Sequence, residues 1–234
     1  MTATAARPRC PRCRRPLATC LCAWVRPTAN RVPVWLLQHP LERDQAKGSL
    51  PLLRLSLARC RCDLVAAHDP GVQAHLAHLA GLAGLAGPAG LADPAALPAP
   101  RPGACATAQP PVLLLYPAER GTIPVTPPLP LPDPAATRLV VLDGTWRKTH
   151  RLLHDHPASV ALPRWPLPAP PAGRYGAIRR AHRPGQLSTL EAVCHALAQL
   201  EGDAARYAPL LAAFDAWVAE EAARAAGHHR RPVG

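Results

Sequence analysis

Short, continuous runs of apolar residues punctuate this chain and predict its strands. Residues 32–38, 112–116 and 138–143 are almost wholly apolar and have the length of a strand. Such a run is typical of a strand that is covered on both faces, as in a parallel α/β sheet. Residues 62–67 form a further short candidate strand. The pattern therefore predicts an α/β fold.

Helical segments are expected between and after these runs. They are residues 50–59, 147–153, 187–200 and 204–226. The first follows a Gly-Ser start signal, and the third begins with Ser188 and Glu191 in the relation of a capping box, in which each satisfies a backbone N–H of the other.

Residues 73–111 consist largely of Leu-Ala-Gly and Ala-Pro repeats and interrupt the pattern. Alanine and leucine favour a helix as far as about residue 85, beyond which glycine and proline break it. We expect this stretch to be an insertion, and residues 163–173, which are rich in proline, to form a loop.

Charge makes nucleic acid the first partner to consider. The formal net charge is +12, and a basic surface raises the local concentration of a polyanion. Biased codon usage is the competing explanation, because only two of the 27 basic residues are lysines. No apolar run reaches 18 residues and none lies near the N-terminus, so we expect no membrane span, no secretory signal and a cytoplasmic protein.

Four of the eight cysteines form the pattern Cys10-x2-Cys13-x6-Cys20-x-Cys22. Four thiolates this close can meet on one tetrahedral ion, and a structural Zn²⁺ site would order a segment that lacks any periodic pattern. In a cytoplasmic chain zinc is favoured over disulfides. The interleaved arginines at positions 9, 12, 14 and 15 would contact phosphates or balance the charge of the thiolates. The other four cysteines are scattered and are expected to be buried or incidental thiols.

The best candidate site directly follows the apolar run 138–143. Asp143, Gly144, Thr145 and Trp146 place a carboxylate and a hydroxyl at the carboxyl end of a buried strand, where α/β proteins bind ligands. The alternative is that Asp143 or Thr145 only caps the following helix. The chain has no Ser-His-Asp elbow, Walker loop or G-x-G-x-x-G, which argues against a hydrolase, a P-loop protein and a Rossmann dehydrogenase.

A second polar group lies at the start of the third predicted helix. The hydroxyls of Ser188 and Thr189 and free N–H groups at a helix start suit a carboxylate or phosphate, and Arg179 offers a clamp for the same anion. A capping box alone would explain Ser188 and Glu191, but not Arg179. His39 is expected to be a hydrogen-bonded structural residue, since a lone histidine after a strand is more often structural than a base.

Five blocks, taken in order with the cysteine pattern, resemble the DTW-domain family. They are Leu37-Gln38-His39-Pro40, Lys47-Gly48-Ser49, Leu114-Leu-Tyr116-Pro117, Leu142-Asp143-Gly144-Thr145-Trp146 and Leu187-Ser188-Thr189-Leu190-Glu191-Ala192. The likeness covers about residues 9–200 apart from 73–111. Asp143, Thr145 and Trp146 match the residues that name the family, whereas Ser49 stands where the family often has threonine.

That family is known as tRNA-uridine aminocarboxypropyltransferases, related to the SPOUT methyltransferases. The resemblance implies a SPOUT-like knotted α/β sheet with flanking helices, and transfer of the 3-amino-3-carboxypropyl group of S-adenosylmethionine to N3 of a uridine in tRNA. It implies Asp143 as the catalytic group, either as base or as partner of the donor's ammonium. The expected donor-binding residues are Tyr116, Pro117, Asp143, Thr145, Trp146, Arg179, Ser188, Thr189 and Glu191.

Three parts are expected. They are a small four-cysteine zinc module (1–26) with Cys10, Cys13, Cys20 and Cys22 as ligands, a catalytic domain (27–202), and a C-terminal helix with a basic tail (203–234). The expected partners are tRNA and S-adenosylmethionine. Two alternatives stay open: a SPOUT-like RNA methyltransferase, which would release S-adenosylhomocysteine, and a non-catalytic zinc-bearing RNA-binding protein without affinity for the donor.

Overall fold

The computed structural model describes residues 8–43, 45, 48–65, 69–79, 112–117, 125–156, 159, 162–169, 171, 173 and 187–229. These residues form a five-stranded sheet in the order β2-β1-β4-β3-β5, in which every neighbouring pair is parallel. The strands are β1 (Val34–Gln38), β2 (Cys60–Leu64), β3 (Val112–Leu115), β4 (Arg138–Asp143) and β5 (Arg164–Trp165). The sequence-based expectation of an α/β fold is confirmed.

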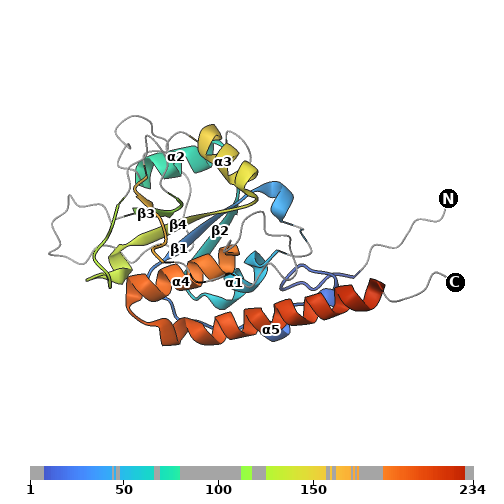
Figure 1. Ribbon diagram of the computed structural model, residues 1–234. Helices are drawn as coiled ribbons and strands as arrows, with labels where there is room; N and C mark the ends of the chain where they lie inside the picture. Colours follow the sequence, from blue (N-terminus) through green and yellow to red (C-terminus); the bar gives the residue numbers. More distant parts are fainter. Residues whose placement is uncertain are drawn as a thin grey trace.

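Helices cover both faces of the sheet (Figure 1). The α-helices are α1 (Leu50–Ser56), α2 (Pro70–Leu79), α3 (Trp146–Asp155), α4 (Thr189–Glu201) and α5 (Ala204–His229). Short 3-10 turns are η1 (Leu17–Thr19), η2 (Cys22–Trp24), η3 (Pro40–Glu42) and η4 (Pro134–Ala136). Helices α2 and α3 lie on one face, and α1, α4 and α5 lie on the other. None of the helices in the described part of the chain combines the length and apolarity that crossing a membrane requires.

Successive strand residues enter two separate cores. Leu36 and Val141 pack on the side of α1, α4 and α5, whereas Leu37 and Val140 pack on the side of α2 and α3. Because side chains alternate between the faces of a strand, a sheet with helices on both sides needs apolar residues at every position. This is the physical reason for the continuous apolar runs in the sequence.

Two expectations about local structure need correction. β5 lies inside the proline-rich segment 163–173, where we expected a loop, and it pairs with β3. A strand of two residues carries no periodic signal, so the pairing partner defines it. Helix α1 ends at Ser56, three residues earlier than expected. Within the repeat-rich stretch 73–111, residues 73–79 belong to α2, and most of the remainder lies outside the described residues.

The cysteine segment packs directly onto the main body. Cys10, Cys13 and Leu21 belong to the same core as Trp217 of α5. The buried Arg15 places its guanidinium carbon 5.0 Å from the centre of the Trp217 ring and donates to the carbonyl of Gly48 at 3.1 Å. The first described residues of the chain are therefore docked on the last helix.

A glycine forms the corner between α4 and α5. Gly202 has φ of +66° and donates to the carbonyls of Ala198 and Gln199, so it ends α4 in the left-handed conformation that glycine adopts without penalty. A Cβ at this position would lie 2.9 Å from Cβ of Pro130.

Candidate active site

A cavity of about 410 Å³ opens at the carboxyl edge of the sheet. This volume falls in the range of roughly 300–1,000 Å³ that is usual for small-molecule sites. Its walls come from the ends of β3, β4 and β5 and from the first turns of α3 and α4. The lining residues are Leu115, Tyr116, Pro117, Val141, Leu142, Gly144, Trp146, Thr149, Pro166, Leu167, Leu187, Ser188, Thr189 and Ala192.

Asp143 lies between lining residues and is held by two side chains. Its Oδ1 accepts a hydrogen bond from Oγ1 of Thr189 at 2.7 Å, and its Oδ2 accepts one from Nε2 of the buried Gln38 at 3.0 Å. Gln38 and Asp143 are neighbours in the register of β1 and β4. The carboxylate is thereby fixed in orientation at the carboxyl ends of two strands and at the start of α4.

Two aromatic rings form one wall of the cavity. Tyr116 and Trp146 meet edge to face, with ring centres 5.5 Å apart. Tyr116 is buried, its hydroxyl lies 3.4 Å from Oγ1 of Thr149, and the guanidinium of Arg164 lies over its ring at 5.1 Å. Trp146 is 47% exposed, although large aromatic rings usually belong to the core. An exposed ring beside an apolar cavity is suited to stacking on a flat ligand.

The N-terminus of α4 faces the same cavity. Ser188 is its N-cap and forms a full capping box with Glu191: Glu191 N–H donates to Ser188 Oγ, and Ser188 N–H donates to a Glu191 carboxylate oxygen at 2.7 Å. The expected capping box is confirmed. Helix N-termini carry partial positive charge and attract anions, so this end of α4 suits a carboxylate.

The structure places the expected donor-binding residues as follows. Tyr116, Pro117, Trp146, Ser188 and Thr189 line the cavity, and Asp143 is bonded to Thr189. Thr145 and Glu191 lie next to lining residues; Thr145 is the N-cap of α3, but its side chain makes no capping hydrogen bond. Capping therefore does not account for Thr145. Arg179 lies outside the described residues.

Several contributors had no assigned role in the sequence, and Thr149 is one of them. Pro166 and Leu167 reach the cavity because they follow β5, and no sequence signal marks them. Gln38 directly precedes His39. Its contact with Asp143 depends on the register of β1 and β4, two strands that are far apart in the chain.

A compact polar cluster adjoins Gly144 of the cavity wall. The backbone N–H of His39 donates to the carbonyl of Asp143 at 3.0 Å, and a Cβ on Gly144 would lie 3.6 Å from Cβ of His39. In the same cluster, Nζ of Lys148 contacts the buried carboxylate of Glu42 at 2.6 Å. Burial lowers the pKa of His39, and the cation of Lys148 lowers it further.

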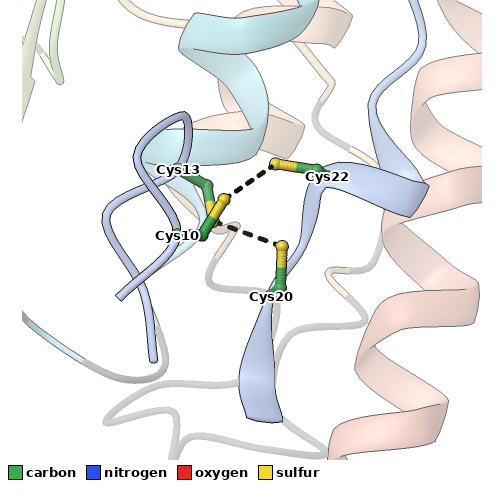
Figure 2. A group of neighbouring side chains, drawn as sticks. All are labelled: Cys10, Cys13, Cys20 and Cys22. Atoms are coloured by element: carbon green, nitrogen blue, oxygen red, sulfur yellow. Dashed lines mark hydrogen bonds between the residues drawn. The ribbon is translucent and has the colours of Figure 1, made fainter. Parts of the chain in front are cut away.

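The four cysteines of the N-terminal segment converge as the spacing predicted (Figure 2). Their Sγ atoms all lie within 4.8 Å of one another, and the pairs Cys10–Cys22 and Cys13–Cys20 are each 3.7 Å apart. With a Zn–S bond of about 2.3 Å, the sulfurs of a tetrahedral site lie about 3.8 Å apart. The cluster therefore has the donor atoms and the spacing of a structural zinc site.

Thiol acidity in the cluster is uneven. The backbone N–H groups of Cys13 and Arg12 lower the pKa of Cys10 to about 6. Burial and the neighbouring thiols raise the pKa of Cys22 to about 12. A thiolate in such a group repels the next one, and a divalent cation relieves that repulsion.

The arginines around the cluster divide into two kinds. Arg9, Arg12 and Arg14 are exposed, whereas Arg15 is buried against Trp217. Of the two roles expected for these arginines, contact with phosphates or balance of the thiolate charge, the first does not fit Arg15, because its guanidinium is buried against Trp217.

A parallel sheet with helices on both faces and a cavity at its carboxyl edge defines a ligand-binding α/β protein. Residues 7–221 match the model of the DTW domain, and the chain belongs to this family, which confirms the resemblance seen in the sequence. A stretch of 58 residues is 40% identical to tRNA-uridine aminocarboxypropyltransferase 2 of Mus musculus; it covers 24% of this chain and only 20% of that relative. No solved structure gives a significant match.

Proposed function

We propose that this protein is a tRNA-uridine aminocarboxypropyltransferase that uses S-adenosylmethionine as donor. The observation that carries the proposal is the convergence of Asp143, Thr189 and Trp146 at one cavity of small-molecule size. The name of the mouse relative and membership of the DTW family support the same reaction.

In the proposed reaction, uridine N3 attacks the γ-carbon of the methionine chain. The N3–Cγ bond forms, the Cγ–S bond breaks with its electron pair going to sulfur, and methylthioadenosine leaves. The sulfonium already activates the leaving group, so the protein has to orient the correct carbon and accept the N3 proton. None of the described lining residues carries a carboxylate or imidazole, so Asp143, bonded to the lining Thr189, is our candidate for the proton acceptor.

The donor is proposed to lie with its polar end at α4. Its carboxylate would be held at the helix N-terminus by Ser188 and Thr189, with Arg179 as the clamp. Its adenine would stack on the exposed Trp146. Tyr116, Pro117, Thr145 and Glu191 complete the proposed donor set, which their positions in or beside the cavity wall support.

A knotted topology of the SPOUT class is part of the proposal. The chain leaves β4 at the centre of the sheet, reaches β5 at its edge, and returns to begin α4 beside the end of β4. The parallel sheet and the start of α4 beside the end of β4 support this part of the proposal.

The cysteine cluster is proposed to hold Zn²⁺ as a structural ion. The ion would cross-link the N-terminal cysteine segment and would take no part in the reaction at the cavity. tRNA is the proposed partner. The net charge of +12 and the exposed Arg9, Arg12 and Arg14 support an RNA-binding surface around the cysteine cluster. We further propose a cytoplasmic protein.

The reaction is tested with purified protein, S-adenosylmethionine and unmodified tRNA. The expected products are 3-(3-amino-3-carboxypropyl)uridine and methylthioadenosine in equal amounts, measured by mass spectrometry of nucleosides. Asp143→Asn is expected to slow transfer at least about 100-fold while the melting temperature stays close to that of the wild type. S-adenosylhomocysteine as the by-product would identify a methyltransferase instead. tRNA binding without donor binding in calorimetry would identify a non-catalytic RNA-binding protein.

A further inference from the structure

Helix α3 has one buried face and one exposed face. Leu152 and Leu153 are buried in the core on this side of the sheet, and the buried Thr149 lines the cavity. Lys148 is paired with the buried Glu42. The exposed positions recur with the period of a helix, and their side chains are aromatic or basic. They are Trp146, Arg147, His150, Arg151 and His154.

This exposed face begins at the cavity. Trp146 lines the cavity, and His150 and His154 follow it on one row of the helix, at steps of four residues. Arg147 and Arg151 form the neighbouring row. At a rise of about 1.5 Å per residue, Arg147 and His154 lie about 10 Å apart along the axis, which is the length of about three nucleotides of one strand.

The outer surface of this face is positively charged. The side chains of Arg151 and His154 are 74% and 84% exposed. Asp155 contacts both, with carboxylate oxygens 3.5 Å from Nε of Arg151 and 3.6 Å from Nδ1 of His154, but its own side chain is only 9% exposed. One carboxylate beside two arginines leaves a net positive charge, and the carboxylate is the group most withdrawn from solvent.

We infer that the exposed face of α3 is an RNA-docking surface, which binds phosphates of the tRNA strand beside the target uridine. This inference rests on the proposed function and assigns the part of the protein that receives the strand. The guanidinium groups of Arg147 and Arg151 can each bind a phosphate through paired hydrogen bonds, and the imidazoles add further N–H donors. Because Trp146 is both a wall of the cavity and the start of this face, a strand whose uridine occupies the cavity can continue along α3.

This surface is separate from the exposed arginines of the cysteine segment. Helix α3 lies on the opposite side of the sheet from α5, on which that segment is docked (Figure 1). Substitutions at distant sites with no shared partner usually have additive effects, so the two surfaces should contribute independently to tRNA binding.

The test measures binding of unmodified tRNA as a function of salt. Arg147→Gln and Arg151→Gln are each expected to reduce the slope of log K against log salt by about one, and the double variant by about two. At about 0.15 M salt the double variant should bind tRNA at least about tenfold more weakly, with unchanged affinity for S-adenosylmethionine and an unchanged melting temperature. Arg224→Gln is the matched control: it removes one exposed arginine from α5, and the slope should not change.

Neutral phosphates test the position of the strand. The tRNA carries methylphosphonate linkages on both sides of the uridine that the wild type modifies. These linkages are expected to weaken binding to the wild type and to weaken binding to the Arg147→Gln, Arg151→Gln double variant much less, because the partners of those phosphates are already missing. Equal losses in the two proteins would place this face on other phosphates and overturn the inference.

Binding and catalysis are measured separately, so the two proposals can fail separately. A wild type that forms no modified uridine rejects the proposed function, while the salt slopes still decide whether α3 binds RNA. An unchanged slope in the double variant overturns the inference, as does an equal loss in Arg224→Gln, which would reflect net charge alone. If the double variant keeps its affinity for tRNA but loses binding to phosphatidylserine vesicles, this face contacts a lipid surface and the inference is also overturned.

Discussion

Oγ1 of Thr189 donates a hydrogen bond to Oδ1 of Asp143 at 2.7 Å, across 46 positions of sequence. The bond joins the end of the central strand β4 to the first residue of α4. It fixes the carboxylate at the position where the helix N-terminus meets the cavity.

Loss of this hydroxyl is expected to slow the transfer step. A hydrogen bond to a charged group contributes about 1.5–3 kcal/mol, so Thr189→Val is expected to lower kcat roughly 10- to 100-fold because the carboxylate loses its orientation. Thr189→Ser keeps the hydroxyl and is the matched control, expected within about threefold of the wild type. Steady-state kinetics measure both, and a Thr189→Val enzyme as fast as Thr189→Ser would contradict the prediction.

The pKa of His39 is expected to lie below its ordinary value of 6.5, because burial and the cation of Lys148 both lower it. Above pH 6.5 the ring is then neutral in the folded and the unfolded chain. As the pH falls below 6.5, the unfolded chain binds a proton first, so this residue reduces the free energy of unfolding until the lowered pKa of the folded state is passed.

NMR titration of the histidine ring measures this pKa. Lys148→Met is expected to raise it, because the variant removes the cation that lowers the pKa and also the contact of that cation with Glu42, whose carboxylate raises the pKa. Arg151→Gln is the control with a smaller upward shift, since the side chain of Arg151 is 74% exposed. A downward shift in Lys148→Met would contradict the assignment.

Metal content is the clearest check on the cysteine cluster. The protein is expected to contain one zinc ion per chain, and Cys20→Ser is expected to reduce this content and to lower the melting temperature. Cys60→Ser is the control and is expected to keep the metal. Elemental analysis measures the metal content of both variants, and a content in Cys20→Ser as high as in Cys60→Ser would place the ion elsewhere.

Removal of the metal should add reactive thiols to those that the zinc-loaded protein already shows. Burial raises the pKa of Cys60 to about 12 and that of Cys62 to about 11, and the buried Cys194 thiol also has a raised pKa, so these three react slowly with an aromatic disulfide at pH 8. Chelation is expected to add fast-reacting thiols, foremost that of Cys10, whose pKa is lowered to about 6 by backbone N–H groups. An unchanged thiol count after chelation would contradict ligation by the cluster.

The arginines around the cluster should separate into a stabilising residue and RNA contacts. Arg15→Ala is expected to lower the free energy of unfolding by about 2 kcal/mol, because the guanidinium is desolvated against Trp217 and bonded to Gly48. Arg12→Gln with Arg14→Gln is expected to leave stability unchanged. The double variant should weaken tRNA binding and reduce the slope of log K against log salt by about two. An unaltered slope would remove this surface from the RNA interface.

Substitution of the corner glycine should affect stability alone. Gly202→Ala is expected to cost about 1–2 kcal/mol for the left-handed conformation, plus the contact with Pro130. Asparagine adopts the left-handed conformation more readily than alanine but keeps the close contact with Pro130. Gly202→Asn should therefore be less destabilising than Gly202→Ala. Denaturant unfolding measures both, and their reversed order would be inconsistent with the positive φ.

The sheet was predictable where burial on both faces requires a continuous apolar run. The run ending in Asp143 is apolar because Val140 and Val141 enter different cores, and a carboxylate at its end marked the site. The capping box at Ser188 was readable because its two partners are three residues apart. The two residues of β5 could not be predicted from the sequence, because so short a strand is defined only by its pairing with β3.

Contacts between distant segments could not be predicted either. The bond from Gln38 to Asp143 depends on the register of β1 and β4, which neither segment encodes alone. Arg15 looked like its arginine neighbours in the sequence, and its burial follows from a tryptophan about 200 positions later. Local spacing was enough to predict the cluster of four cysteines, since all four lie within thirteen residues.

The docking of the cysteine segment on α5 sets an order of events during synthesis. The four thiols leave the ribosome well before the helix that carries Phe214 and Trp217, residues of the same core. Until α5 is made, the segment lacks the contact between Arg15 and Trp217, and a bound ion would contribute a larger part of its order. Removal of α5 would thus expose the four cysteines to solvent.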